Sequence, residues 1–192
     1  MSNIPSFIIL LGSVTPPGRM HRALGDAIDQ ANQNGTENWA LIDLGTLQIG
    51  FADGTPIDQL QDDTGALVDQ VSASKGILIA SPVYRASLTG ALKNALDLLP
   101  VDALREKPVG ILAMGGSNHH FLGVASHLRD VLGWFGAIIA PTDVYLTSAD
   151  FSDGLPTPEA TSELESLLAT IATLSRSLAE TELGPAPLAA KY

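Results

Sequence analysis

An unbroken apolar stretch, a polar turn and an amphipathic helix follow one another between residues 76 and 99. The stretch Gly76–Ala80 contains no polar side chain, which is typical of a parallel strand covered on both faces. After Pro82, apolar residues recur at helical spacing and would form one face against a sheet. These residues are Leu88, Ala91, Leu92, Ala95, Leu96 and Leu99. The segment therefore predicts a strand, a turn and a helix of an α/β protein.

The same alternation of apolar strands and amphipathic helices runs along the chain. Strands are predicted at Phe7–Leu11, Trp39–Leu44, Gly76–Ala80, Val109–Met114 and Ala137–Pro141, the last with an extension to Val144–Leu146. Helices are predicted at Met20–Gln33, Asp58–Ser74, 88–99, His120–Phe135 and Pro158–Ala179. Five strand–helix units predict a doubly wound five-stranded parallel sheet with helices on both faces. We expect one domain over residues 1–183 and a flexible tail over 184–192.

Composition excludes several classes of function. The net charge of -11, with only 10 Lys and Arg and no basic run, argues against a nucleic-acid or anionic membrane partner. No apolar stretch approaches the roughly 20 residues that cross a bilayer, and Met1–Pro5 lacks the basic segment of a secretory signal. A cytoplasmic location is therefore expected.

Redox and metal chemistry are limited by the absence of cysteine and the scatter of the four histidines. Without cysteine there is no disulfide, thiol redox centre or thiolate metal site, and the histidines have no metal-ligand spacing. The expectation is no metal, and any redox chemistry would come from a bound cofactor.

Three polar turns follow the first, third and fourth predicted strands. The turn at residues 12–19 leads into a helix, where free amides, hydroxyls, Arg19 and nearby Arg22 could hold a phosphate. The second turn is 81–89, and the third is 115–118, whose two glycines allow backbone to approach a planar ring. In the strand order 2-1-3-4-5 these turns would converge at the carboxyl edge of the sheet. Their combination predicts a mononucleotide site.

The side chains of the second turn include ligand candidates and structural groups. Tyr84, Arg85, Ser87 and Thr89 could contact a ligand, and the two hydroxyl residues could also cap the following helix. Lys93 and Asp97 stand four residues apart, which is the spacing of a surface ion pair of small energetic value.

These motifs together resemble the NADPH-dependent FMN reductase family of flavodoxin-like proteins. The resemblance rests on Leu11–Gly12–Ser13, on the run from Ser81 to Asp97 and on Gly115–Gly116, and it spans roughly residues 6–145. Asp97–Pro100 and His119–Leu122 look closest to flavin reductases that supply two-component monooxygenases, such as alkanesulfonate systems.

The resemblance implies a flavodoxin-like fold, FMN as cofactor, and NADPH or NADH as co-substrate. Residues implied at the FMN phosphate are Ser13, Thr15, Arg19, His21 and Arg22. Residues implied at the isoalloxazine ring are Pro82, Val83, Tyr84, Arg85, Ser87, Gly115, Gly116 and Ser117. Thr15 stands where the family usually has an arginine.

No catalytic acid or base is implied, because hydride transfer between stacked rings mainly requires orientation and donors near the pyrimidine end. The backbone amides of 83–85 and 115–117 are the candidate donors, and Arg85 is a candidate for the phosphates of the nicotinamide cofactor. His119 and His120 are interpreted first as polar residues at a helix start, and as candidates to line the flavin or nicotinamide site second.

Three functions stay open at this point. The first is an NAD(P)H-dependent FMN reductase that passes reduced FMN to a partner monooxygenase or to oxygen. The second retains FMN and reduces quinones, azo dyes or metal ions. The third, a flavodoxin-like electron carrier, is disfavoured because residues 12–19 lack the Thr- and Ser-rich phosphate loop of such carriers.

The resemblance also implies a homodimer or homotetramer formed through the helices after the third and fourth strands. In the two-component members, a one-residue bulge in the helix after the double glycine carries an aromatic residue or histidine used at the subunit interface. Ser126, beside His127, holds the matching place here. The long loop 45–56, rich in glycine and apolar residues, is a candidate to cover a site or to reach a neighbouring subunit.

Overall fold

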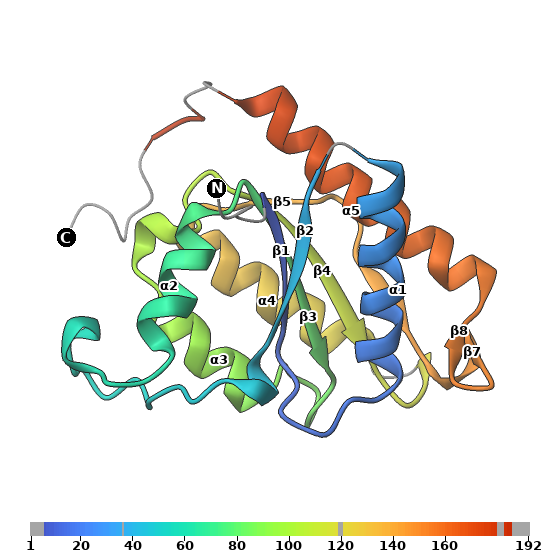
Figure 1. Ribbon diagram of the computed structural model, residues 1–192, viewed down its shortest axis with the longest axis horizontal. Coiled ribbons are helices and arrows are strands. Elements are labelled where there is room, and N and C mark those ends of the chain that lie inside the picture. Colours follow the sequence, from blue (N-terminus) through green and yellow to red (C-terminus); the bar gives the residue numbers. More distant parts are fainter. Residues whose placement is uncertain (1–5, 36, 119–120, 180–182, 186–192) are drawn as a thin grey trace.

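The sheet has the predicted strand order in a computed structural model, which describes residues 6–35, 37–118, 121–179 and 183–185. Strands β1 (Phe7–Leu11), β2 (Trp39–Asp43), β3 (Gly76–Pro82), β4 (Pro108–Met114) and β5 (Ile138–Ile139) lie in the order β2-β1-β3-β4-β5. All neighbouring pairs are parallel, with Phe7 opposite both Trp39 and Gly76 (Figure 1). The doubly wound fold of the flavodoxin-like class is confirmed.

The fifth strand is divided into β5 and a second piece, β6 (Val144–Leu146), both of which pair with β4. Pro141 lies at the break and has no amide proton to donate to the ladder. Arg129 binds the carbonyl oxygens exposed there, because its Nη2 donates to Ala140 O at 3.1 Å and to Pro141 O at 3.3 Å. The predicted strand with its extension is therefore present, but it is interrupted.

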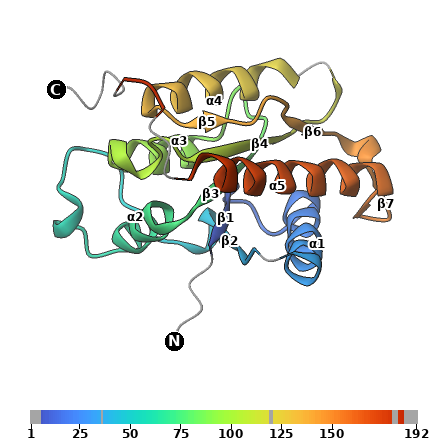
Figure 2. The same cartoon turned by 90° about the horizontal axis from the view of Figure 1, so that it is seen from above.

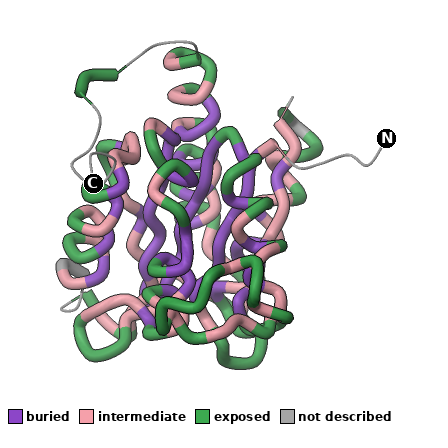
Figure 3. Tube along the Cα trace, turned by 90° about the vertical axis from the view of Figure 1, so that its left-hand side faces the viewer, coloured by how far each residue is buried: buried purple, intermediate pink, exposed green. Residues whose placement is uncertain are grey.

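Helices cover both faces of the sheet. Helices α1 (Arg19–Asn34) and α5 (Pro158–Leu178) pack on one face with Ile9, Leu11 and Leu78. Helices α2 (Thr64–Ala73), α3 (Gly90–Asp97) and α4 (Phe121–Phe135) pack on the other face with Ile8 and Leu10 (Figure 2). Buried residues lie along the middle of the molecule (Figure 3). Alternate residues of β1 enter opposite cores, and all five are buried. This explains the unbroken apolar stretches.

Helix α2 begins at Thr64, six residues later than predicted. Residues 57–59 form a short 3₁₀ helix instead, and the two aspartates before Thr64 bind the preceding loop. Asp62 accepts from the amides of Gly50 (2.7 Å) and Thr64 (2.8 Å), while Asp63 accepts from the amide of Gln48 (2.8 Å). The hydrogen bonds from Thr64 lower the pKa of Asp62. Short polar side chains compete with the helix for backbone donors, which explains the late start.

A small hairpin, β7 (Phe151–Ser152) with β8 (Leu155–Pro156), was not predicted. It precedes α5, and its turn contains Asp153 and Gly154, both with positive φ. Most of the predicted tail 184–192 lies outside the described residues, as do His119 and His120.

Candidate functional site

The three predicted turns meet at the carboxyl edge of the sheet. The amide of Gly12 donates to Ala80 O at 2.8 Å, and the amide of Val83 donates to Met114 O at 2.8 Å. Thr89 caps α3 by accepting from the amide of Leu92 (3.1 Å), and its hydroxyl donates to Gly12 O. The turns after β1, β3 and β4 are therefore tied to one another by hydrogen bonds.

A pocket of about 220 Å³ opens between the first turn and the strand ends. Ser13, Thr15, Arg19, His21 and Pro82 line it, so it brings together five of the predicted residues from two turns. Ser13 Oγ lies 2.8 Å from Thr15 Oγ1. The pocket leads to the start of α1, where no acidic side chain stands in the first turn and no side chain caps the helix. The exposed amides at such a helix start favour an anion.

His21 and Asp43 both line this pocket and their side chains lie next to each other. His21 Nε2 lies 3.6 Å from Asp43 Oδ2, and Asp43 Oδ1 accepts from the amide of Gly45 at 2.9 Å. Asp43 ends β2 and was not among the predicted site residues. The rule that ligands bind beyond the carboxyl ends of parallel strands could have identified it.

Arg19 and Arg22, both in the first turn of α1, contact the segment 148–154 that follows β6. Arg19 Nη2 donates to Ser148 Oγ at 3.2 Å, and its guanidinium lies 5.4 Å from the centre of the Phe151 ring. Arg22 donates to Gly154 O at 3.2 Å and does not line the pocket. Of the two predicted cations, only Arg19 lies where it would meet a phosphate in this pocket. The sequence Asp153–Gly154 is a turn signal that could have revealed the hairpin.

The second turn is a tight reversal over residues 84–87. The amide of Tyr84 donates to Ser87 O at 2.9 Å and the amide of Ser87 donates to Tyr84 O at 3.0 Å. The two residues between them, Arg85 (φ 51°) and Ala86 (φ 61°), have left-handed backbone, which costs an L-residue roughly 1–2 kcal/mol. Tyr84 is 47% exposed at the tip of the strand. A strained turn at the carboxyl edge is typical of a functional segment.

The third turn is packed too closely for any side chain at its first glycine. A Cβ on Gly115 would stand 2.0 Å from the hydroxyl of Tyr145 and 3.4 Å from Val83 Cγ2. Tyr145 donates to Ser117 O at 2.8 Å, and burial raises the pKa of its phenol, which favours the neutral donor form. Residues 115–117 are therefore fixed against β6 and the second turn.

Several predicted donors already have partners within the protein. The amides of Val83 and Tyr84 donate to carbonyl oxygens, and the amide of Gly115 donates to Leu146 O at 3.0 Å. Within the described part of the chain, the amides of Arg85 and Gly116 have no such partner. Thr89 is 3% exposed and caps α3, which confirms its prediction as a capping residue. Ser87 does not cap α3, because its hydroxyl lies 2.8 Å from His127 Nδ1.

The long loop after β2 is fixed at several points. Asn94 of α3 binds it twice, accepting from the amide of Ala52 at 2.9 Å and donating to Gly50 O at 2.9 Å. Phe51 stands between these contacts and is 78% exposed. On the same helix, the predicted surface ion pair is confirmed, because Lys93 Nζ lies 2.7 Å from Asp97 Oδ1.

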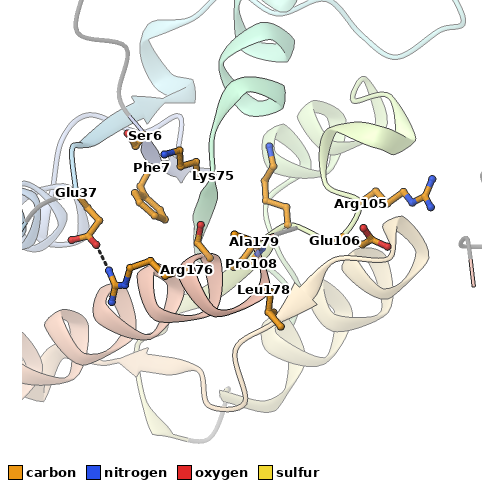
Figure 4. A pocket seen from close by; sticks show the side chains of 12 residues that line it. Ser6, Phe7, Glu37, Lys75, Arg105, Glu106, Pro108, Arg176, Leu178 and Ala179 are labelled. Atoms are coloured by element: carbon orange, nitrogen blue, oxygen red, sulfur yellow. Dashed lines mark hydrogen bonds and ion pairs between the residues drawn. The ribbon is translucent and has the colours of Figure 1, made fainter. Parts of the chain in front are cut away.

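A larger cavity lies at the opposite, amino edge of the sheet. It measures about 710 Å³, and its walls include Lys75, Glu37 and Arg176 (Figure 4). Arg176 pairs with Glu37, and Lys107 binds the carbonyl oxygens of Val71 and Ser72 at the end of α2. Arg176 and Lys107 already have protein partners, and the converging turns and the uncapped helix start lie at the carboxyl edge, so we place the candidate site there.

Among the described residues, no cluster of His, Asp or Glu is arranged to hold a metal ion. No helix in the described ranges is long and apolar enough to cross a membrane.

The strand order and the converging turns define a flavodoxin-like α/β domain. A solved structure titled NADH:FMN oxidoreductase (EMOB), apo form, superposes with a TM-score of 0.75 at 25% identity and covers 96% of this chain and 95% of that one. A flavodoxin from the domain Archaea superposes with a TM-score of 0.61 at 14% identity, which supports the fold alone.

The chain belongs to the NADPH-dependent FMN reductase family, whose model matches residues 5–151. A relative named FMN reductase (NADPH) from Escherichia coli is 32% identical over 168 residues, or 85% of this chain and 84% of the relative. An NAD(P)H-dependent FAD/FMN reductase from Geobacillus thermodenitrificans is 35% identical over 113 residues. That match spans 59% of this chain and about three fifths (61%) of the relative's length. The recognised resemblance is thereby confirmed.

Proposed function

We propose that this protein is an NAD(P)H-dependent FMN reductase. The observation that carries the proposal is the convergence of the phosphate pocket with the two ring-facing turns at the carboxyl edge, in a chain of this family. FMN, when bound, would accept a hydride from NADH or NADPH. The residues of this chain bind and orient the two nucleotides, and no acid–base pair is needed for that step.

The first turn would hold the phosphate of FMN. Its pocket of about 220 Å³ is smaller than the 300–1,000 Å³ of most small-molecule sites, so it fits the phosphate end and not the whole cofactor. Ser13 and Thr15 offer hydroxyls, Arg19 offers the positive charge, and the amides at the start of α1 lack a capping side chain. Arg22 would act indirectly, by fixing the hairpin through Gly154.

The isoalloxazine ring would lie outside this pocket, over the other two turns. Pro82 connects the two parts, because it lines the pocket and begins the second turn. The amides of Arg85 and Gly116, which bond to no other part of the described chain, are the ones that would donate to the pyrimidine end of the ring. Val83, Tyr84, Ser87, Gly115 and Ser117 would shape this surface.

The decisive experiment measures NADH and NADPH oxidation by cofactor-stripped protein, with and without added FMN. Riboflavin and a quinone serve as competing acceptors. Saturable oxidation that requires added FMN supports the proposal. No oxidation of either nucleotide by protein that binds FMN would contradict it and would indicate an electron carrier.

An FMN-retaining reductase of quinones or azo dyes is the second candidate. A relative named FMN-dependent NADPH-azoreductase, from Staphylococcus aureus, is 32% identical over 111 residues and supports this alternative. Quinone reduction by protein that keeps its FMN through purification would favour it. Delivery of reduced FMN to a partner monooxygenase rests on the resemblance of the Asp97–Pro100 segment, and co-purification with such an enzyme would test it.

Association of two or more copies would use α3 and α4. A groove of about 440 Å³ between these helices is lined by Leu96, Leu99, Val131 and Trp134, and Trp134 is 56% exposed. An exposed tryptophan beside an apolar groove is typical of an interface. Light scattering should give a dimer or tetramer for the natural chain and a smaller species for Trp134→Glu.

A further inference from the structure

We infer that His127 is a positioning residue, which holds the 84–87 turn in its left-handed conformation through Ser87. This inference rests on the proposed function where it concerns flavin, because the turn is part of the proposed ring surface. The contact itself joins residues 40 positions apart: His127 Nδ1, in the second turn of α4, lies 2.8 Å from Ser87 Oγ.

A second contact brings α4 against the same turn. The backbone of Gly123 is so near Ala86 that a Cβ on the glycine would stand 2.0 Å from Ala86 O and 2.9 Å from its carbonyl carbon. Gly123 and His127 are four residues apart, so they lie on one face of the helix. One face of α4 therefore meets the turn at two successive points.

The turn needs such support because its conformation is unfavourable in isolation. Neither Arg85 nor Ala86 is glycine, yet both have φ above 50°. Residues of this kind keep left-handed backbone only where the surrounding structure fixes it. The pair of hydrogen bonds between Tyr84 and Ser87 closes the turn, and His127 and Gly123 fix its position on the sheet.

Helix α4 is regular throughout residues 121–135, so Ser126 does not occupy a bulge. A bulge at Ser126 would widen the helical turn between Gly123 and His127 and would rotate His127 away from Ser87. The regular helix and the Ser87–His127 hydrogen bond are therefore consistent with each other.

The test compares His127→Leu with His127→Asn in ligand-free protein. Asparagine carries a polar atom at the position of Nδ1 and can donate or accept, whereas leucine cannot form the bond. Hydrogen exchange at the amides of Tyr84 and Ser87 reports the turn directly. Loss of one hydrogen bond should accelerate their exchange about fivefold in His127→Leu, and His127→Asn should restore the slow rate. Equal rates in the two variants would overturn the inference.

A matched pair of alanine substitutions tests the backbone contact on the same helix. Gly123→Ala should accelerate exchange at Tyr84 and Ser87, because the new methyl would overlap Ala86 O. Gly133→Ala introduces a methyl into open space and should leave these two amides unchanged. The same exchange pattern in both variants would contradict the assigned contact.

Steady-state kinetics connect the turn to flavin. His127→Leu should raise KM for FMN about fivefold with little change in kcat, and Ser87→Ala should add little to it in the double variant. Additive effects of the two substitutions would overturn the inference. Faster exchange with an unchanged KM for FMN would show that His127 holds the turn but that the turn does not serve flavin. If the natural chain oxidised neither NADH nor NADPH, the proposed function would fail, and the exchange data would still decide whether His127 holds the turn.

Discussion

The two edges of the sheet differ in the volume of their cavities, in the pairing of their charged groups and in the number of consecutive residues with left-handed backbone. The amino edge has the larger cavity, about 710 Å³, but Arg176 there is paired with Glu37 and Lys107 caps α2. The carboxyl edge has a pocket of about 220 Å³, beside two consecutive non-glycine residues with left-handed backbone. The strained, closely packed turn favours the carboxyl edge as the ligand site, and the pairing of Arg176 and Lys107 argues against the amino edge.

Alanine substitution at two crowded glycines, one near each edge, should have the largest effect on stability. A Cβ on Gly12 would stand 2.6 Å from Leu92 Cβ, and one on Gly76 would stand 2.7 Å from Ile171 Cγ2. Either alanine substitution should lower the free energy of unfolding by about 2–3 kcal/mol in urea denaturation, because a full core must expand. Only Gly12→Ala should also raise KM for FMN, since it displaces the phosphate loop. An equal KM for both variants would remove the distinction between the edges.

Two arginines provide the second comparison. Arg19→Ala should raise KM for FMN about tenfold to a hundredfold, because a charge-assisted hydrogen bond to phosphate contributes roughly 1.5–3 kcal/mol. Its KM for riboflavin, which has no phosphate, should stay unchanged. Arg176→Ala should leave both values as they are and cost at most about 1 kcal/mol of stability, as exposed ion pairs do. A similar loss for FMN and riboflavin in Arg19→Ala would place the phosphate elsewhere.

Lys107, at the amino edge, should make the free energy of unfolding depend on pH without affecting the binding of FMN at the carboxyl edge. Burial lowers the pKa of this lysine from 10.5 to about 8, although the carbonyl oxygens at the end of α2 favour its charged form. Between these two values the unfolded chain binds a proton that the folded chain lacks, so stability rises with pH across this window. Relative to Lys107→Met, the natural chain should gain about 1–2 kcal/mol from pH 7.5 to pH 10, which is less than the full shift would give. Urea denaturation at both pH values measures this gain.

If the free energy of unfolding changed equally with pH in the natural chain and in Lys107→Met, the lowered pKa of Lys107 would be contradicted. The KM for FMN should be the same in both proteins at pH 7.5, because Lys107 lies at the amino edge. A changed KM would show that the two edges are coupled through the sheet.

The fold was predictable because hydrophobic spacing and strand length are local signals. The strand β1 and the helix α5 have bounds within one residue of those expected, since the first is an unbroken apolar run and the second a long amphipathic segment. The start of α2 was not predictable from periodicity, because Asp62 and Asp63 turn their carboxylates to amides of residues 48 and 50. The spacing of apolar residues does not indicate such long-range hydrogen bonds.

The candidate site was predictable in its turns but not in its internal pairing. The glycines, hydroxyls and arginines of the three turns were visible in the sequence. The orientation of Arg22 toward Gly154, and of Ser87 toward His127, depends on contacts between residues 132 and 40 positions apart. Only the assembled sheet shows which of these polar groups have partners in the protein and which stand open to a ligand.

The smallest predicted effect comes from two residues with left-handed backbone, one at each edge. Ala86 has φ 61° and Glu106, in the wall of the amino-edge cavity, has φ 55°. Glycine relieves the strain at either position but also increases the entropy of the unfolded chain, so each variant should be about 0.5 kcal/mol more stable. Thermal denaturation measures this gain.

The two glycine variants should differ in their KM for FMN. In Ala86→Gly the turn can adopt other conformations, and KM for FMN should rise about twofold to threefold, because a less ordered surface must be fixed on binding. Glu106→Gly should leave this KM unchanged, because the segment at the amino edge contacts no part of the proposed site. If strain is relieved at both positions with no change in KM, then the left-handed turn serves the fold and not the ligand, and the contrast between the two edges would rest on the phosphate pocket alone.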